Sequence, residues 1–316
     1  MPSLRIVFMG TAELAGASLR ALGNDSSFQV AAVVTQPDRP AGRELKPQFS
    51  PVKRTALQLG LPILQPERAR HENFIQQLRE LRHDLIVVVA YGQILPQTIL
   101  DLPRFGALNV HTSLLPKYRG AAPIQWAILD DEAQTGVTIM KMDAGLDTGP
   151  MLTQTSTPIA ATDDAQTLHD RLAALGAQLL IKTIPDYVAG KILPQPQPTE
   201  GASYARKITK EDGRLDWTQP ARTLWNRVRG LTPWPGAFTF QKVDSGKRLL
   251  KVWTAEVEPN ATGTPGEIIH ADKSGLMVGC GHGALRLMNL QREGGRRLSA
   301  PEFLAGAGIK QGECLG

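Results

Sequence analysis

Asn109 and His111 are the two residues whose types and spacing best suit catalysis. They belong to an apolar stretch, residues 107–111, that predicts a buried strand, and residues two apart in a strand point to the same face. Asn109 offers an uncharged amide donor, and His111 offers a proton near neutral pH. Together they suit addition to a carbonyl group, with one side chain holding the oxyanion and the other moving protons. A purely structural role for His111 is the alternative.

A third catalytic group is expected in the loop at residues 142–149 (MDAGLDTG). This loop follows a predicted strand at 137–141, so we expect it to lie at the same end of the sheet as the Asn–His pair. Either Asp143 or Asp147 could orient the histidine and favour its charged form. Solvated turn residues are the alternative, and spacing alone does not choose between the two aspartates.

The elements that must position these groups alternate between strands and helices. The strongest buried-strand signal is residues 85–90, which include three consecutive valines. The other elements predicted from hydrophobic patterns and turn residues are strands at 4–9, 30–35, 62–64, 107–111 and 137–141, and helices at 13–22, 50–59 and 71–81. This order predicts an α/β fold with a mostly parallel sheet, in which ligands bind beyond the carboxyl ends of the strands.

The pattern changes after a long predicted helix at residues 167–188. A proline-rich segment at 190–205 predicts a semi-rigid linker. Beyond it lie a predicted helix and five short strands, at 220–231, 237–241, 248–257, 267–270, 276–279 and 284–290. So many short strands predict a small β-barrel or sandwich. We therefore expect a catalytic domain at 1–189, the linker, and a C-terminal domain at 206–316.

Composition and charge restrict the possible classes of protein. The net charge is +5, and the positive excess lies in residues 206–316, with 17 Lys and Arg against 11 Asp and Glu. This asymmetry hints at a polyanionic partner, although a basic soluble surface is the simpler explanation. Cys280 and Cys314 are too few for a disulfide framework or a four-cysteine zinc site.

Targeting segments and several common active sites are not evident. The longest apolar run is far shorter than the roughly 20 residues of a membrane helix, and the N-terminus predicts a strand rather than a signal peptide. We therefore expect a cytoplasmic protein. Motifs for dinucleotides, nucleoside triphosphates, zinc hydrolysis and serine hydrolysis are missing, and no metal site is expected.

Seven motifs carry a resemblance that covers nearly the whole chain. They are residues 35–43 (TQPDRPAGR), 88–92 (VVAYG), 109–116 (NVHTSLLP), 118–125 (YRGAAPIQ), 135–140 (TGVTIM), 142–149 (MDAGLDTG) and 204–217 (YARKITKEDGRLDW). With them the sequence resembles the methionyl-tRNA formyltransferase family. The resemblance implies a Rossmann-like formyltransferase domain followed by a small OB-like C-terminal β-barrel. It also implies transfer of a formyl group from 10-formyltetrahydrofolate to the methionine amino group of initiator methionyl-tRNA, for translation initiation.

Carried over residue by residue, the resemblance implies a catalytic set of Asn109, His111 and Asp147. Asn109 and protonated His111 would stabilise the tetrahedral oxyanion. Asp147 would hold His111 and assist proton movement from the amine to the departing folate nitrogen. The implied folate-binding residues are Ser113, Leu114, Leu115, Pro116, Ala90 and Asp143.

The loop at residues 36–50 and the basic C-terminal domain are the expected tRNA contacts. The loop is longer than the roughly 2–6 residues usual between a strand and a helix, and its basic side chains could grip phosphates. The resemblance implies this role chiefly for Arg43, and a surface loop without function is the alternative. The candidate tRNA-binding residues are Arg39, Arg43, Lys46, Lys207, Lys210 and Arg248, with Arg227, Arg229, Lys247 and Lys251 as further basic candidates.

The sequence departs from the family at Ala12 and Leu14, where members usually carry proline and phenylalanine. This changes the expected edge of the folate pocket. Relatives that formylate an amino sugar-nucleotide or a ribonucleotide amine, or that hydrolyse 10-formyltetrahydrofolate, are alternatives within the enzymes. A catalytically silent tRNA-binding protein is an alternative from another class, against which the intact catalytic set argues. No association segment is evident, so we expect a monomer.

Overall fold

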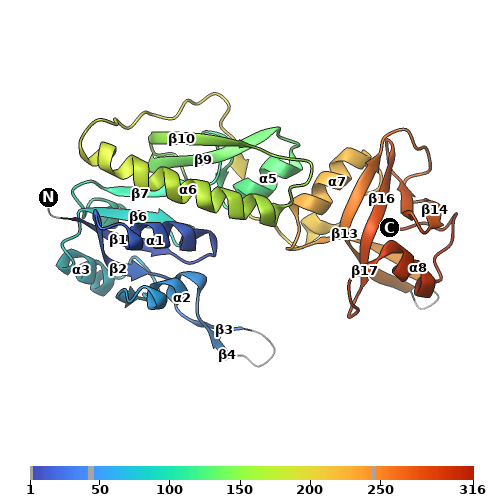
Figure 1. Ribbon diagram of the computed structural model, residues 1–316, viewed down its shortest axis with the longest axis horizontal. Coiled ribbons are helices and arrows are strands. Elements are labelled where there is room, and N and C mark those ends of the chain that lie inside the picture. The colour runs from blue at the N-terminus through green and yellow to red at the C-terminus, as the bar shows by residue number, and fades with distance from the viewer. Residues whose placement is uncertain (1–2, 42–45, 244–245) are drawn as a thin grey trace. The chain divides into compact units, whose positions relative to one another are not determined.

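The computed structural model describes residues 3–41, 46–243 and 246–316, which form two compact units (Figure 1). Unit 1 contains the chain up to Pro123, Gln134–Thr157 and His169–Ala205, and unit 2 contains Ile124–Ala133, Pro158–Leu168 and Arg206–Gly316. Each unit has a hydrophobic core of its own. The proline-rich segment 190–205 thus groups with unit 1, while two short stretches from the first half of the chain group with unit 2.

A seven-stranded sheet forms the centre of unit 1, with the strand order β10-β9-β7-β6-β1-β2-β5. Its strands are β1 (Leu4–Gly10), β2 (Phe28–Val34), β5 (Ile63–Leu64), β6 (Leu85–Val89), β7 (Ala107–His111), β9 (Gln134–Lys141) and β10 (Met151–Pro158). The five strands from β7 to β5 in this order pair in parallel. The expectation of a mostly parallel sheet is confirmed.

Strand β9 runs in the opposite direction to its neighbour β7, with Lys141 paired to Leu108 and Thr138 to His111. The assumption that the carboxyl ends of β9 and β7 lie on the same side of the sheet was therefore wrong. Six consecutive residues of β9 are buried, and a strand that is buried on both faces carries no signal of its direction. The loop after β9 therefore starts beside the amino end of β7, and it reaches the predicted site only by turning back toward the carboxyl end of β7.

Helices pack on the sheet of unit 1. They are α1 (Leu14–Asn24), α2 (Pro51–Gln58), α3 (Glu72–Glu80), α4 (Gln97–Leu100) and α6 (Ala165–Val188). Helix α2 begins as its Ser-Pro pair predicts, because the Ser50 hydroxyl accepts a hydrogen bond from the Lys53 backbone N–H at 3.0 Å. Helix α6 approaches β7 closely at Gly176, where a Cβ would lie 2.8 Å from Val110 Cγ1.

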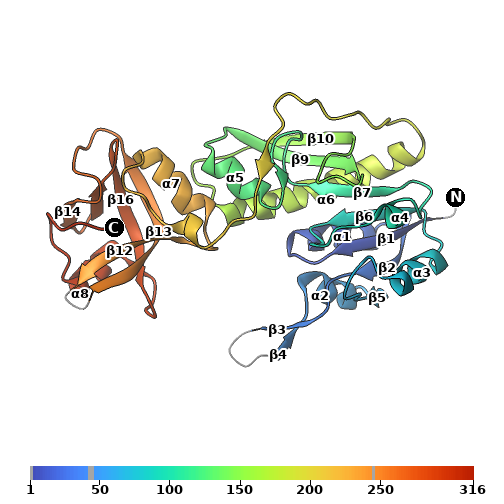
Figure 2. The ribbon, with the colours of Figure 1, turned by 180° about the vertical axis from the view of Figure 1, so that it is seen from behind.

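Several elements lie outside the sequence-based expectations. They are β10, the hairpin of β3 (Arg39–Ala41) and β4 (Lys46–Gln48), the short strands β8 (Arg119–Gly120) and β11 (Tyr204–Ala205), and α5 (Pro123–Leu129). Strand β10 is rich in threonine and largely accessible, so it lacks the apolar run that marks the inner strands. The β3–β4 hairpin extends from unit 1 before α2 in both ribbon views (Figure 2).

Unit 2 is built on antiparallel strands, consistent with the small barrel that the sequence predicts. Its sheet has the order β12-β13-β16-β15-β14, with β17 paired to β16. The elements are η1 (Glu211–Gly213), α7 (Ala221–Gly230), β12 (Ala237–Val243), β13 (Gly246–Glu258), β14 (Ile268–Asp272), β15 (Gly275–Gly279), β16 (Ala284–Arg292), β17 (Leu298–Ser299) and α8 (Ala300–Ala307).

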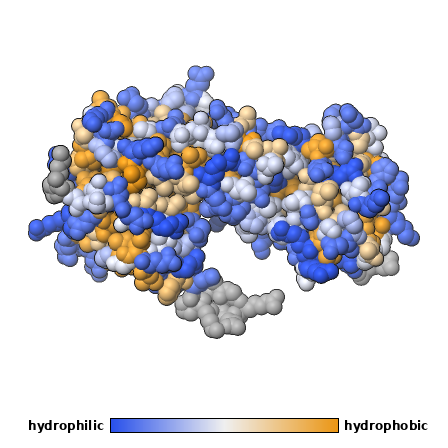
Figure 3. Space-filling model, in the orientation of Figure 1, coloured by the Kyte–Doolittle hydropathy of each residue, from blue (hydrophilic) through white to orange (hydrophobic). Residues whose placement is uncertain are grey.

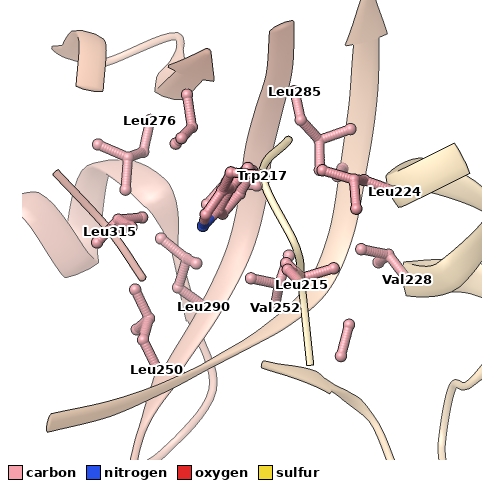
Figure 4. Packing of buried hydrophobic residues seen from close by; sticks show 14 of the residues in the cluster. Leu215, Trp217, Leu224, Val228, Leu250, Val252, Leu276, Leu285, Leu290 and Leu315 are labelled. Carbon is pink, nitrogen blue, oxygen red and sulfur yellow. The ribbon is translucent and has the colours of Figure 1, made fainter. Parts of the chain in front are cut away.

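The C-terminal tail connects the two edge strands of this sheet. The Gly316 N–H donates to the Phe240 carbonyl of β12 at 2.8 Å, and the Ile268 N–H of β14 donates to the Glu313 carbonyl at 2.8 Å. Inside lies a leucine-rich core around Trp217, whose indole N–H donates to the Thr239 hydroxyl at 3.0 Å (Figure 4). The tail thus covers edges that would otherwise present unpaired backbone groups.

Candidate active site

The Asp147 carboxylate is the point where three chain segments meet. Its Oδ1 accepts a hydrogen bond from Asn109 Nδ2 at 3.3 Å, and its Oδ2 accepts one from the Gly120 backbone N–H at 2.8 Å. Oδ2 also lies 3.6 Å from His111 Nδ1, which is within ion-pair range but too long for a hydrogen bond. The structure therefore brings the three predicted catalytic residues together.

The His111 ring faces an acceptor at each nitrogen. Nε2 lies 2.9 Å from the Tyr118 carbonyl oxygen, which can only accept, so this nitrogen carries a proton. Nδ1 faces the Asp147 carboxylate. Both ring nitrogens of His111 therefore lie beside hydrogen-bond acceptors. His111 is only 5% exposed, so water screens the electrostatic interactions of its ring poorly.

Unusual backbone geometry places these atoms. Asp147 and Tyr118 adopt the left-handed region, with φ of +53° and +60°, a conformation that side chains other than glycine rarely adopt. Gly149 lies so close to the Lys141 carbonyl that an added Cβ would be 1.9 Å from its oxygen. The loop after β9 thus folds back on the strand that precedes it. This turn brings Asp147 to the side chains of Asn109 and His111 on β7.

A cavity of about 670 Å³ opens beside the Asn–His–Asp wall. Its walls come from the ends of β6 and β7, the segments that follow them, and the loop after β9. The lining residues are Leu14, Val88, Ala90, Tyr91, Gly92, Gln93, Ile94, Leu95, Asn109, Val110, His111, Thr112, Gly120, Ala121, Pro123, Met142, Asp143, Ala144, Gly145, Leu146 and Asp147. A mostly apolar cavity of this size with a few converging polar groups suits a small-molecule cosubstrate.

The predicted folate residues divide into two groups in the structure. Ala90 and Asp143 line the cavity, whereas Ser113, Leu114, Leu115 and Pro116 are not among its lining residues. The Ser113 hydroxyl donates to the Lys117 carbonyl at 2.6 Å, and the Leu115 N–H donates to the Thr138 hydroxyl at 3.1 Å. The polar groups of the 113–116 segment therefore hold the turn that follows β7.

Asp143 uses its carboxylate within its own loop. Oδ1 accepts from the Gly145 N–H at 3.0 Å, and both oxygens accept from the Thr148 hydroxyl, at 2.9 and 3.0 Å. Of the two aspartates that spacing left open, Asp147 is the one beside the histidine, while Asp143 shapes the loop.

Residues that sequence reasoning did not assign also contribute to the site. The Tyr118 carbonyl and the Gly120 N–H contact His111 and Asp147. Leu14, where the sequence departs from the family, lines the cavity together with Tyr91 of the 88–92 motif. Burial raises the pKa of Tyr91 to about 12, so its hydroxyl stays neutral and cannot serve as a base at neutral pH. The motifs at 88–92 and 118–125 marked these segments, but backbone atoms leave no signature in residue types.

The arrangement suits charge stabilisation during addition to a carbonyl. Asn109 supplies an amide donor, His111 supplies a buried imidazole, and the Asp147 carboxylate contacts both side chains. Within residues 3–41, 46–243 and 246–316, no group of three or more His, Cys, Asp or Glu side chains is placed to hold a metal ion. Burial raises the pKa of Cys280 to about 12, which makes this thiol a poor nucleophile.

The predicted tRNA contacts in unit 1 lie on the β3–β4 hairpin. Arg39 is exposed in β3, and Lys46 belongs to β4, where its backbone pairs with Ala41. Arg43 lies outside the described residues. The base of the hairpin is fixed by an ion pair between Asp38 and Lys53, which holds the pKa of the Asp38 carboxyl below its usual value.

The predicted contacts in unit 2 differ in accessibility. Lys207, Lys210 and Arg248 are exposed, on a unit whose visible face mixes hydrophilic and hydrophobic areas (Figure 3). Arg229 is only 8% exposed and donates to the Ala160 and Asp163 carbonyls at 3.1 Å each, so its expected role as a phosphate contact was wrong. Arg227 likewise donates to a backbone carbonyl, that of Asp212.

None of the helices described by the structure is long and apolar enough to cross a membrane.

Comparison with known sequences identifies relatives of the entire chain. The profile of the formyl transferase family matches residues 4–184, and that of the formyl transferase C-terminal domain matches residues 207–308. Methionyl-tRNA formyltransferase from Caldanaerobacter subterraneus subsp. tengcongensis is 50% identical over 99% of this chain and 100% of its own length. The enzyme of that name from Citrifermentans bemidjiense is 49% identical over 100% of this chain and 98% of its own length.

Solved structures with lower identity share the fold. An N-formyltransferase from Helicobacter canadensis, in complex with folinic acid and dTDP-3-aminofucose, aligns over 90% of this chain and 99% of its own, with a TM-score of 0.64 and 17% identity. HypX from Aquifex aeolicus in complex with tetrahydrofolic acid aligns over 98% of this chain and 48% of its own, with a TM-score of 0.61 and 18% identity.

Proposed function

The chain belongs to the methionyl-tRNA formyltransferase family, and from this premise we propose that it formylates initiator methionyl-tRNA. The formyl donor is 10-formyltetrahydrofolate and the acceptor is the free amino group of the methionyl moiety. The observation that carries the proposal is the convergence of Asn109, His111 and Asp147 on the wall of the 670 Å³ cavity.

The reaction forms one carbon–nitrogen bond and breaks another. The methionyl amine attacks the formyl carbon, and the carbonyl oxygen becomes an oxyanion. Asn109 Nδ2, which has a second N–H beyond the one given to Asp147, donates to this oxyanion. The bond from the formyl carbon to N10 of the folate then breaks, and the proton lost by the amine passes to that nitrogen.

His111 acts through its charge and Asp147 through its position. Because both ring nitrogens of His111 already face acceptors, the imidazolium stabilises the oxyanion electrostatically rather than by a third hydrogen bond. Asp147 keeps the imidazolium and the Asn109 amide oriented, and its carboxylate is the nearest base to assist the proton transfer from amine to folate.

The same proposal assigns the binding surfaces. The folate-derived donor would occupy the cavity against Ala90 and the loop that contains Asp143. Segment 113–116 would support this pocket through the turn after β7. We propose residues 1–189 as the catalytic domain and 206–316 as the tRNA-binding domain, with Arg39, Arg43, Lys46, Lys207, Lys210 and Arg248 as phosphate contacts. We also propose that the enzyme works in the cytoplasm, where methionyl-tRNA serves translation, and that it acts as a monomer.

The decisive experiment incubates the purified chain with 10-formyltetrahydrofolate and methionyl-initiator tRNA, with uncharged tRNA as the control. Formation of formylmethionyl-tRNA on the charged tRNA alone is the expected result. Folate turnover without tRNA formylation would contradict the proposal and indicate a hydrolase or an enzyme for a small amine. Binding of tRNA with no turnover of either substrate would indicate a catalytically silent binding protein.

A further inference from the structure

We infer that Gln197 is a positioning residue, which holds the catalytic loop at Asp147 from a segment that the sequence predicts to be a linker. The inference rests on the proposed function for its kinetic consequences. Its structural basis is independent of that function, because it concerns contacts within unit 1.

The side-chain amide of Gln197 uses both ends to join two parts of the site. Its Nε2 donates to the backbone carbonyls of Asp147 and Gly149, each at 2.8 Å. Its Oε1 accepts from Arg119 Nε at 3.0 Å and from Arg119 Nη2 at 2.8 Å. A glutamine amide has two donor hydrogens and two acceptor lone pairs, so these four hydrogen bonds use its full capacity.

The loop that Gln197 contacts needs restraint. Asp147 adopts the left-handed region with φ of +53°, a strained conformation that persists only where its surroundings enforce it. The two carbonyls that accept from Nε2 lie on Asp147 itself and two residues further on. They therefore fix the backbone from which the Asp147 carboxylate projects toward Asn109 and His111.

The other end of the amide holds the opposite side of the site. Arg119 lies between Tyr118, whose carbonyl faces His111 Nε2, and Gly120, whose N–H donates to Asp147 Oδ2. A single side chain thus ties the Asp147 loop to the residues that supply partners for His111 and Asp147. Because the Gly120 N–H donates to Asp147 Oδ2, the rate of hydrogen exchange at the Gly120 amide reports whether the Asp147 loop is still aligned with residues 118–120.

Backbone contacts on both sides keep Gln197 in place. Upstream, Gln195 and Met151 exchange two backbone hydrogen bonds of 2.8 Å. Downstream, the Arg119 N–H donates to the Ser203 carbonyl at 2.9 Å, and the Tyr118 N–H donates to the Ser203 hydroxyl at 2.9 Å. The segment is held before and after Gln197, so its amide is preorganised to restrain the loop.

Two substitutions of Gln197 separate the two ends of the amide. Gln197→Glu keeps an acceptor for Arg119 but sets a carboxylate against two carbonyl oxygens, whereas Gln197→Ala removes all four hydrogen bonds. Gln195→Ala is the matched control, because Gln195 is an exposed neighbour whose side chain makes only a 3.4 Å contact with the Leu193 carbonyl. Formylation kinetics, amide hydrogen exchange at Gly120 and melting temperature are measured for each variant in the full chain.

Both Gln197 variants should lower kcat about 10–100-fold, the cost of misplacing a catalytic group by about an ångström, with KM changed little. Gly120 amide exchange should accelerate in both, and Gln195→Ala should match the wild type in kcat and exchange. In an Asp147→Asn background, the added Gln197→Ala substitution should lower kcat little further, because no carboxylate remains to be positioned.

The inference would be overturned if Gln197→Ala lowered kcat equally with and without the Asp147 carboxylate. It would also be overturned if only KM changed, or if amide exchange at Gly120 stayed at the wild-type rate. If the wild type fails to formylate tRNA, the proposed function fails, and Gly120 exchange alone decides the positioning role. Accelerated exchange in both Gln197 variants would then support that role, and unchanged exchange would refute it.

Discussion

The proposed catalytic wall of unit 1 (Asn109, His111 and Asp147) and the proposed tRNA-binding surface of unit 2 use polar side chains under opposite constraints. In the wall, His111 is 5% exposed, its Nε2 faces the Tyr118 carbonyl, and the Asp147 carboxylate accepts from Asn109 and Gly120. In unit 2, Lys207, Lys210 and Arg248 stand exposed on the surface. A developing oxyanion needs donors fixed in place before the reaction, whereas a phosphate backbone responds mainly to the amount of charge near it. Substitutions in the first region should therefore affect kcat, and those in the second should affect affinity and its salt dependence.

The largest effect is expected in the catalytic wall. His111→Ala and Asp147→Asn should each lower kcat by roughly 10²–10³, comparable to the loss of one preorganised group that stabilises the oxyanion, because the first removes the proposed charge and the second releases His111 and Asn109. Melting temperatures should stay close to that of the wild type, since neither side chain belongs to a hydrophobic core. A wild-type rate in either variant, measured by steady-state formylation, would remove the residue from the mechanism.

A slightly smaller decrease in kcat should follow from displacing the loop after β9 while leaving the side chains of Asn109, His111 and Asp147 unchanged. Gly149→Ala places a Cβ 1.9 Å from the Lys141 carbonyl oxygen, so the loop must move. We expect up to about 10²-fold lower kcat from displaced Asp147. Gly306→Ala is the control, because nothing lies within 4 Å of the added atom. Equal kinetics in the two variants would show that the close approach does not position Asp147.

The basic surface should respond in binding rather than in turnover. Lys210→Ala and Arg248→Ala should each weaken tRNA binding and lower the slope of log affinity against log salt by about one if the residue contacts a phosphate. At saturating tRNA, kcat should be unchanged. Lys191→Ala, an exposed lysine paired with Asp186 in unit 1, serves as the control. If a variant keeps the wild-type slope of log affinity against log salt, the substituted residue does not contact a phosphate.

The smallest effect concerns His83, a buried histidine that contrasts with His111. Burial lowers the pKa of His83, so the unfolded chain takes up a proton at a higher pH than the folded one. Its contribution to stability is therefore complete above about pH 6.5 and is lost as the pH falls from there toward the folded pKa. His83→Leu should flatten the fall in unfolding free energy between pH 7 and 5, by at most about 1.4 kcal/mol per pH unit. Parallel urea-unfolding curves for variant and wild type across this range would contradict this.

Local patterns predicted many of the elements and singled out Asn109 and His111 as candidate catalytic residues. Alternation and apolar runs gave β1, β6 and β7 nearly to their ends, because side-chain periodicity is a property of neighbouring residues. The same logic placed Asn109 and His111 on one face of a strand. It did not find β10, whose threonine-rich sequence is only partly buried at the edge of the sheet.

Tertiary structure decided how these pieces meet. The sequence identified two aspartates after β9, but only the fold shows that β9 is antiparallel, that its loop turns back, and that Asp147 rather than Asp143 reaches His111. In the same way, residues 190–205 have the composition of a linker, yet Gln197 bridges two sides of the site. The physical reason is that residue type and spacing encode local conformation and burial. Strand direction and hydrogen bonds between residues as distant as 119 and 197 depend on the path of the whole chain.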